Sequence, residues 1–256
     1  MGTVIRRGRD RCDYVLTVQG FAQSRDAAVR MILAGQVKSN GAIVDKPSRM
    51  IPTDAVIEII GGSRPFVSRG GEKLMAALDA SSIAPQGMIC LDVGCSTGGF
   101  TDCLLQRGAG RVYAVDVGYG QFDWRLRQDP RVVLIERTNI RYISPSAIPE
   151  PVDLVVIDVS FISLTKVLPP IMQFLRFPAR VVTLIKPQFE VGKGQVGRGG
   201  VVRDDTQRAE AVQRVVRFAE EIGLRAVRTI VSPIKGKKGN QEILAIFEYN
   251  TSFRGM

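Results

Sequence analysis

A glycine-rich turn between a short apolar run and a segment with helical spacing constrains the fold of this chain more than any other feature. The run Ile89-Cys-Leu-Asp92 is followed by Gly94, Gly98 and Gly99, and apolar side chains then recur with helical spacing over residues 100–105. Glycine lacks a Cβ and tolerates positive φ, so such a turn brings bare backbone close to a ligand. The pattern predicts a strand, a turn and a helix whose first N–H groups face a crevice at the carboxyl end of the strand.

The spacing within this turn indicates which ligand it serves. The turn reads D-x-G-x-x-x-G-G, without the third glycine of the dinucleotide fingerprint and without the lysine of the P-loop, which argues against a pyrophosphate. A second apolar run, 111–116, ends in Asp116, where open α/β folds place the carboxylate that holds ribose hydroxyls. This arrangement resembles the S-adenosylmethionine site of Rossmann-like methyltransferases. We interpret Asp116 as a ligand contact rather than a solvated strand end.

Charge and the absence of histidine narrow the possible functions. The chain of 256 residues has 35 Lys and Arg against 25 Asp and Glu, a formal charge of +10, which favours a polyanionic partner, nucleic acid before an anionic membrane. It contains no histidine, which excludes Ser-His-Asp hydrolysis, Cys-His proteolysis and His-containing zinc sites. Proton transfer therefore falls to Lys, Asp, Glu, Tyr or Cys.

The cysteines and the apolar runs predict a cytoplasmic protein that does not bind a membrane. Cys12, Cys90, Cys95 and Cys103 form no C-x-x-C pair and are expected as small buried thiols in a reducing cytosol. The first residues carry charge but no apolar region of a signal peptide follows them. The longest apolar runs are far shorter than the ~20 residues that a membrane helix requires.

Residues 1–60 are predicted to form a small α+β domain. A helix begins at Cys12, and Ser24 can cap a second helix over residues 25–33. An Asn40-Gly41 turn predicts a hairpin, and residues 56–60 supply another strand.

The order of polar and small residues in this segment resembles the alpha-L RNA-binding motif, and the resemblance implies binding to structured RNA. The residues that carry it are Arg11-x-Asp, Ser24-Arg25, Ala27-Ala28, Ile32, Gly35-x-Val37, Asn40-Gly41 and Lys46-Pro47. Cys12 stands where the motif usually has leucine. For any single basic residue here, a solvated face is as good an interpretation as an RNA contact.

The composition of residues 61–66 is that of a linker. Residues 67–256 then alternate strand and helix, as a parallel sheet requires. We expect an α/β domain with a seven-stranded Rossmann-like methyltransferase sheet, whose last strand is an antiparallel hairpin partner. The predicted strands lie near 88–92, 111–116, 131–135, 153–158, 180–186, 225–231 and 242–249, and the predicted helices near 99–107, 163–175 and 205–222. A further helix is expected to open near Phe66 and to carry Arg69 and Lys73 on one face.

Polar residues at the carboxyl ends of parallel strands are candidates for chemistry, because the ligand crevice lies there. They are Asp92, Asp116, Asp158 and Lys186. Lys186 closes an apolar strand, and removal from water favours the neutral amine, which can accept a proton. A Lys186–Asp158 pair that serves only to neutralise charge is the structural alternative.

Residue types also sort the possible methyl acceptors. No cysteine follows a proline, which argues against methylation of cytosine C5, and Asp158-Val-Ser-Phe161 stands where methylation of an exocyclic base nitrogen needs an Asn/Asp-Pro-Pro-aromatic motif. A hydroxyl acceptor remains, which must be positioned and helped to lose its proton.

Six segments resemble the TlyA family, whose members join an alpha-L module to an FtsJ-like ribose methyltransferase domain. They are residues 68–74, 91–100, 114–121, 157–164, 184–190 and 239–242. The resemblance implies a catalytic tetrad of Lys73, Asp158, Lys186 and Glu242, ribosomal RNA of one or both subunits as the substrate, and 2′-O-methylcytidine as the product. The segment Arg64-Pro-Phe-Val67 departs from the Arg-x-Trp-Val of some members.

The candidate ligand contacts follow from these motifs. Those expected to bind S-adenosylmethionine are Asp92, Gly94, Ser96, Thr97, Gly98, Gly99, Phe100, Asp116, Val117, Asn139 and Asp158. Those expected to bind RNA are Arg11, Arg25, Arg30, Lys38, Arg69, Lys193 and Arg198, the last two on a glycine-rich loop at 192–200. We expect no metal site, and a chain that works as a monomer or a weak dimer on ribosomal subunits.

Two other functions remain open at this point. One is a membrane-acting haemolysin, a label that TlyA-family members often carry. The other is a ribosome-binding protein whose enzyme domain is vestigial, against which the intact Gly94, Gly98, Gly99 and tetrad positions argue. A dehydrogenase is disfavoured because the pyrophosphate glycines are missing.

Overall fold

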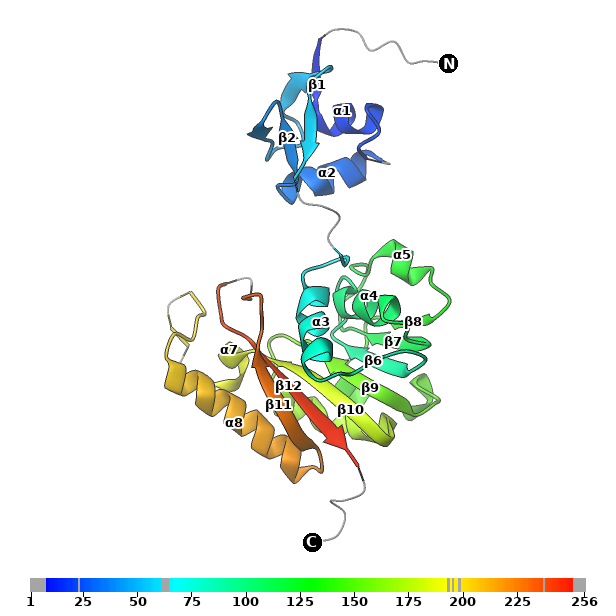
Figure 1. Cartoon of the computed structure of the whole chain (residues 1–256), viewed down its shortest axis with the longest axis vertical. Helices are drawn as coiled ribbons and strands as arrows, with labels where there is room; N and C mark the ends of the chain where they lie inside the picture. Colours follow the sequence, from blue (N-terminus) through cyan, green and yellow to red (C-terminus); the bar gives the residue numbers. More distant parts are fainter. Residues whose placement is uncertain are drawn as a thin grey trace. The chain divides into compact units, whose positions relative to one another are not determined.

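The computed structural model describes residues 8–22, 24–60, 65–192, 194, 196–197, 199–236 and 238–250. The chain divides into two compact units, Met1–Arg64 and Pro65–Met256 (Figure 1). The boundary between them lies inside the segment 61–66. Each unit has its own hydrophobic core and is described by itself.

The first unit packs two helices against short antiparallel strands. Its elements are β1 (Arg9–Arg11), α1 (Cys12–Val18), α2 (Arg25–Leu33), β2 (Val37–Ser39), β3 (Ala42–Ile43), β4 (Met50–Pro52) and β5 (Ile57–Ile59). Strand β1 pairs with β4, and β2 lies between β3 and β5. The pairing of β1 with β4 carries no turn signal of its own and was absent from the sequence prediction.

Local chemistry accounts for the predicted elements of this unit. The Ser24 side chain accepts a hydrogen bond from the Ala27 N–H at 3.2 Å and so caps α2. Asn40 and Gly41 both have positive φ, 49° and 80°, which suits the two-residue turn of a tight hairpin. Ser39 pairs with Ala42 across this turn, so the predicted hairpin is confirmed.

The second unit is built on a seven-stranded sheet in the order β11-β12-β10-β9-β6-β7-β8. Its strands are β6 (Ile89–Val93), β7 (Arg111–Val115), β8 (Val132–Ile135), β9 (Val152–Ile157), β10 (Leu175–Ile185), β11 (Arg225–Val231) and β12 (Ile243–Tyr249). Strands β8, β7, β6, β9 and β10 pair in parallel, and β12 pairs antiparallel with β10 and β11. The predicted methyltransferase sheet with an antiparallel last strand is therefore confirmed.

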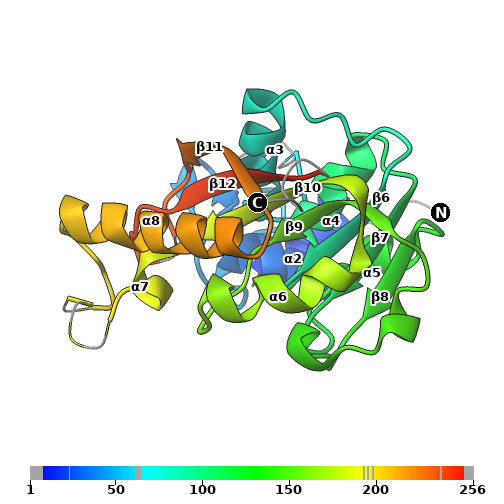
Figure 2. The ribbon, with the colours of Figure 1, turned by 90° about the horizontal axis from the view of Figure 1, so that it is seen from below.

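Helices cover both faces of this sheet (Figure 2). The helices are α3 (Gly70–Ala80), α4 (Gly99–Gln106), α5 (Trp124–Arg127), α6 (Leu168–Ile171), α7 (Pro187–Glu190) and α8 (Asp205–Glu221). On one face, α3 and α4 pack with side chains such as Leu154 and Val156. On the other, α6 and α8 pack with the alternate residues Val155 and Ile157. A strand that is buried on both faces in this way is typical of a parallel sheet.

The helix predicted over residues 163–175 is wrong. Three short pieces replace it, η3 (Leu164–Lys166), α6 and η4 (Met172–Phe174), and β10 begins at Leu175 instead of near 180. Pro169 and Pro170 are the cause, because proline has no N–H to donate and its ring clashes with the carbonyl one turn earlier. The short α5, α7, η1 (Ile140–Tyr142) and η2 (Pro145–Ala147) were not predicted either.

Two neighbouring residues of α2 test the packing of the first unit. Ile32 is fully buried in its core, whereas the side chain of Leu33 is 67% exposed. We expect Ile32→Ala to lower the free energy of unfolding of this unit by about 2–5 kcal/mol, because it removes core atoms and leaves a cavity. Leu33→Ala, the matched control, should change it by about 0.5 kcal/mol or less. Urea unfolding of both variants checks this, and equal effects would contradict the packing described.

Candidate active site

A cavity of about 810 Å³ opens at the carboxyl ends of β6, β7 and β9. Gly94 and Asp116 follow the ends of β6 and β7, and the segment from Asp158 to Ser163 follows β9. The rest of the lining comes from residues after β7 and β8 and from η3 and α7, among them Val117, Gln121, Thr138, Asn139, Ile140, Arg141, Lys166 and Phe189. The position agrees with the rule for open parallel sheets, and the volume suits a ligand of nucleoside size.

The glycines of the turn serve mainly to let the protein pack against itself. At Gly94, φ is +85° and a Cβ would lie 2.5 Å from the Asp158 carbonyl oxygen. At Gly98, φ is +93° and a Cβ would lie 2.5 Å from Leu126 Cδ1. At Gly99, a Cβ would collide with the side chain of Ser68. Of the three, only Gly94 lines the cavity.

The carboxylate of Asp116 is fixed at the edge of the cavity by backbone amides. Its Oδ2 accepts from the Ser96 N–H at 2.8 Å, and its Oδ1 accepts from the Gly118 N–H at 2.6 Å. Ser96 takes a positive φ of 49° to make this contact. Each carboxylate oxygen can accept more than one hydrogen bond, so the hydroxyls of a ribose can bind to the free lone pairs.

Asp92 lies beneath the turn instead of facing the cavity. It is fully buried, and its Oδ2 accepts from Thr101 Oγ1 at 2.7 Å, which ties the end of β6 to α4. Its Oδ1 has no hydrogen-bond partner among the described residues. Burial raises the pKa of Asp92 to about 7. This carboxyl group therefore stabilises the glycine turn by joining the strand before it to the helix after it.

The predicted cofactor residues divide into two groups. Six line the cavity, namely Gly94, Ser96, Asp116, Val117, Asn139 and Asp158. Five do not, namely Asp92, Thr97, Gly98, Gly99 and Phe100. Phe100 is buried in the core, and the Thr97 carbonyl accepts from the Asp123 N–H at 3.2 Å. The second group holds the turn in shape.

The four predicted tetrad residues form two ion pairs. Lys186 Nζ lies 2.6 Å from Asp158 Oδ1 and donates to Ser160 Oγ at 2.9 Å. Lys73 Nζ donates to Glu242 Oε2 at 2.5 Å, and both of these side chains are buried. Each positive charge is thus placed against a negative one in a partly dehydrated site, where an unpaired charge would be costly.

The sheet brings the two pairs to the same end of the domain. Strands β10 and β12 pair Ile185 with Ile243, so Lys186 and Glu242 occupy the next facing positions of the ladder. Helix α3 packs against β12 and delivers Lys73 to Glu242. Asp158 follows β9, whose neighbour is β10. Residues more than 160 positions apart in the chain, such as Lys73 and Glu242, therefore meet at one edge of the sheet.

In the first unit, a buried carboxylate gathers two of the predicted RNA-binding arginines. Asp13 accepts from Arg11 Nε at 3.0 Å and Nη2 at 2.8 Å, and from Arg25 Nη2 at 3.5 Å. These contacts, those of Arg11 first, hold the pKa of Asp13 below its usual value. The side chains of Arg11 and Arg25 remain 44% and 55% exposed, so both stay accessible to a ligand in solution.

The other predicted RNA contacts are spread over the chain. Arg30 is exposed on α2, Lys38 is half-buried on β2, and Arg69 is exposed just before α3. Lys193 and Arg198 lie outside the described residues.

Sequence reasoning missed several residues of the site. The pairing of Asp13 with Arg11 could have been predicted, because the Arg11-x-Asp13 spacing places the carboxylate beside the guanidinium group. Ser160 and Glu190 stand inside sequence motifs without a signal of their own, and their contacts depend on how the loops fold. The signal for Gln121, Thr138 and Arg141 is only that they follow strands.

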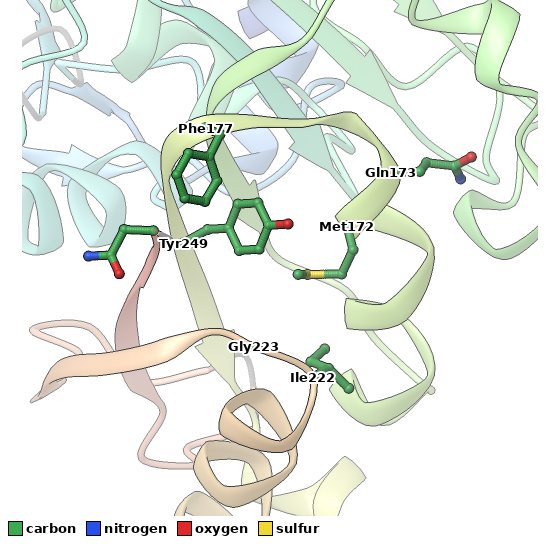
Figure 3. Close-up of a pocket in the computed structure, with 7 residues that line it drawn as sticks. Met172, Gln173, Phe177, Ile222, Gly223 and Tyr249 are labelled. Atoms are coloured by element: carbon green, nitrogen blue, oxygen red, sulfur yellow. The ribbon is translucent and has the colours of Figure 1, made fainter. Parts of the chain in front are cut away.

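A second cavity, of about 370 Å³, lies at the other end of the sheet, where β10 begins and β12 ends (Figure 3). Phe177 and Tyr249 meet edge to face in it, with ring centroids 5.3 Å apart. It is lined by Met172, Gln173, Phe177, Ile222, Gly223, Tyr249 and Asn250. None of these side chains carries a charge, so this cavity offers no group that can take up a proton at neutral pH.

Comparisons with protein families match almost the whole chain. Residues 66–249 match the FtsJ-like methyltransferase model, and residues 11–57 match the S4 domain model. The chain is 51% identical over 235 residues to the 16S/23S rRNA (cytidine-2'-O)-methyltransferase TlyA of Mycobacterium tuberculosis, which covers 91% of this chain and 88% of that protein.

Two further relatives carry the name hemolysin. The chain is 43% identical over 238 residues to Hemolysin A of Brachyspira hyodysenteriae, covering 93% of this chain and 99% of that protein. A solved structure from Streptococcus thermophilus with the hemolysin name has 41% identity and a TM-score of 0.75, covering 95% of this chain and 90% of that chain.

Two glycines with positive φ test the turn at the cavity. We expect Gly94→Ala to weaken the binding of S-adenosylmethionine by about tenfold or more, since the new Cβ forces the Asp158 backbone away. The matched control is Gly87→Ala, where φ is +73° but nothing lies within 4 Å of the new Cβ. Its cofactor affinity should stay within about twofold of wild type, because only the backbone strain is shared. Calorimetric titration measures both, and unchanged affinity in Gly94→Ala would refute the role given to this contact.

Proposed function

The chain belongs to the TlyA family, which joins an S4 domain to an FtsJ-like methyltransferase domain, and we propose that it transfers a methyl group to the ribose 2′-hydroxyl of a cytidine in ribosomal RNA. The observation that carries the proposal is the Lys186–Asp158 pair, whose carboxylate lines the cavity that Asp116 also lines. The name of the Mycobacterium tuberculosis relative supports cytidine as the nucleoside.

The cavity fits S-adenosylmethionine, which supplies an activated methyl group on a sulfonium. Asp116, held by the Ser96 and Gly118 amides, is placed to accept hydrogen bonds from the ribose of the cofactor. Apolar and polar side chains after β8, including Ile140 and Asn139, can take the adenine. The carboxylate of Asp158, paired with Lys186, lines the same cavity and so links the cofactor site to the proposed catalytic amine.

Lys186 is the residue assigned to the acceptor hydroxyl. As an ammonium it has only N–H donors, so it can orient the hydroxyl oxygen but cannot take its proton. Asp158, at 2.6 Å, is the group that can receive a proton from Lys186 and leave the amine free to act as a base. In either state, Ser160 fixes the direction of the amine through the bond at 2.9 Å.

The Lys73–Glu242 pair lies beside Lys186 and contributes to the charge around its amine. Glu242 stands beside Lys186 in the β10–β12 ladder, and its charge is balanced by Lys73 on α3. Lys73 thus keeps a second carboxylate from holding the Lys186 ammonium. We assign Lys73 and Glu242 to setting the charge around Lys186 and around the phosphates that flank the substrate ribose.

The first unit is assigned to RNA binding. Its S4 match supports this, and the Arg11 and Arg25 guanidinium groups offer two neighbouring positive charges for phosphate oxygens. The formal charge of +10 of the whole chain adds a general attraction for RNA.

The hemolysin name of some relatives raises a second function, action on membranes. Among the described residues, no helix combines the length and the apolar character needed to cross a bilayer. A leakage assay with liposomes and purified protein distinguishes the two functions, because the proposed enzyme should release no trapped dye.

Two variants of Lys186 test its assignment. We expect Lys186→Ala to lower the rate of methyl transfer by about 10²–10⁴-fold, the usual contribution of a positioned acid or base. Lys186→Arg should be almost as slow, since a guanidinium keeps the charge but cannot accept a proton. Both should bind S-adenosylmethionine with nearly wild-type affinity. Single-turnover transfer to ribosomal RNA measures the rates, and loss of cofactor binding together with activity would defeat the assignment.

The paired arginines of the first unit make a separate prediction. Arg25→Ala should weaken RNA binding and reduce the slope of log affinity against log salt by about 1, if one phosphate contact is lost. Asp13→Ala should also weaken binding, because both guanidinium groups lose the partner that holds them together. Arg176→Ala, which breaks an exposed pair with Asp153 in the second unit, is the control. Filter binding at several salt concentrations measures the slopes, and an unchanged slope for Arg25→Ala would contradict the contact.

A further inference from the structure

Beyond the tetrad, the geometry points to Glu190 as a positioning residue for the methyl transfer proposed above. We infer that its buried carboxylate clamps the segment that follows Asp158, so that Ser160 in this segment aims the amine of Lys186 at the acceptor hydroxyl. The inference rests on the proposed function and adds Glu190 and Ser160 to the residues on which the reaction depends.

Two hydrogen bonds join Glu190 to the segment after β9. Its Oε2 accepts from Ser163 Oγ at 2.6 Å, and its Oε1 accepts from the Leu164 N–H at 2.9 Å. Glu190 is only 5% exposed, so both bonds are shielded from competing water. Together they fix the start of η3 and the residues just before it.

Glu190 is itself held from the other side. Helix α7 follows Lys186 directly and ends at Glu190, and Arg214 of α8 donates to the Glu190 carbonyl oxygen at 2.6 Å. Phe189, next to it, packs on Phe161 with ring centroids 5.1 Å apart. The backbone that carries the Glu190 carboxylate is therefore held in place.

The contacts close a ring around Lys186. From Lys186 the backbone runs through α7 to Glu190, the carboxylate reaches Ser163, and three residues earlier Ser160 accepts from Lys186 Nζ at 2.9 Å. The other partner, Asp158, is held independently, because its N–H donates to the Val93 carbonyl within the sheet. Release of the clamp should therefore free Ser160 while Asp158 stays in place.

Val159 and Ile162 pack against the hydrophobic core, but the two residues between them, Ser160 and Phe161, depend on the clamp. Ser160 and Phe161 are exposed, and Phe161 has a φ of +64°, which is unfavourable for a side chain of its size. A strained and exposed turn keeps one conformation only when its surroundings impose it. Those surroundings are the Glu190 bonds, the Phe161–Phe189 contact and the core packing of Val159 and Ile162.

A double-mutant cycle tests the inference with the full chain. Glu190→Ala and Ser160→Ala should each slow single-turnover methyl transfer to ribosomal RNA by about 10- to 100-fold, the effect expected when a reacting group is displaced by about 1 Å. If Glu190 acts through Ser160, the double variant should be no more than about threefold slower than the slower single variant. Glu190→Gln should restore the rate to within about threefold of wild type, because the amide can bond both Ser163 and Leu164.

Controls separate this effect from a loss of folding. Ser163 caps η3 and Ser144 caps η2 in the same way, each accepting from the N–H two residues ahead. Ser163→Ala, which leaves Glu190 in place, should slow transfer, whereas Ser144→Ala should not. Thermal melting and cofactor titration show whether each variant is folded, and the Ser163 and Ser144 pair decides the matter if Glu190→Ala does not fold.

The rates of these variants distinguish failure of the inference from failure of the proposed function. Three results would each overturn the inference: independent, multiplying effects of Glu190→Ala and Ser160→Ala on the rate, a Glu190→Ala rate near wild type, or a Glu190→Gln rate as low as that of Glu190→Ala. In each of these cases, methyl transfer by the wild-type chain would still uphold the proposed function. A wild-type chain that transfers no methyl group to ribosomal RNA would overturn both.

Discussion

The pairing of Lys186 with Asp158 is the interaction on which the site depends. Both residues follow strands that are buried on both faces of the sheet, so each charge stands where few waters reach it. Breaking a buried ion pair by removing one partner costs about 3–5 kcal/mol, since it leaves a charge without compensation. The sheet order meets this requirement, because β10 lies beside β9 and Asp158 therefore stands next to Lys186, while Glu242, on the side of β12, is paired with Lys73. The strand order of the second unit thus determines which charged residues meet at the carboxyl end of its parallel strands.

The glycine turn acts on this edge indirectly. Because Gly99 has no side chain, α4 approaches α3 so closely that a Cβ would lie 3.1 Å from the Gly71 N. Lys73 follows two residues later on α3 and meets Glu242. Gly94 plays the same part towards Asp158, whose carbonyl oxygen comes against its Cα. The turn therefore shapes the cofactor cavity with one glycine and positions two members of the tetrad by its close packing.

The sequence predicted those features that depend on local pattern. Apolar runs and turn residues marked the seven strands, and the Asn40-Gly41 hairpin followed from two residues that accept positive φ. Asp158 and Lys186 were picked as candidates because they follow strands, and the carboxyl ends of parallel strands meet at one end of the sheet, whereas Lys73 and Glu242 were expected only from the resemblance to the TlyA family. The helix predicted over residues 163–175 followed the apolar periodicity and ignored Pro169 and Pro170. Two prolines within a helix interrupt its hydrogen bonds, so they should have been given more weight than the periodicity. The partners of Asp92 and Glu190 could not be predicted, because Thr101, Ser163 and Leu164 meet these carboxylates only once the turns and loops around them have folded.

The methyl acceptor proposed for this chain is a ribose hydroxyl of ribosomal RNA. To test this, the purified chain is incubated with isolated small and large ribosomal subunits and S-adenosylmethionine carrying tritium in its methyl group. The labelled RNA is then digested to nucleosides and identified by mass spectrometry. We expect 2′-O-methylcytidine in at least one subunit. Label on a base, on ribosomal protein only, or on neither subunit would contradict it.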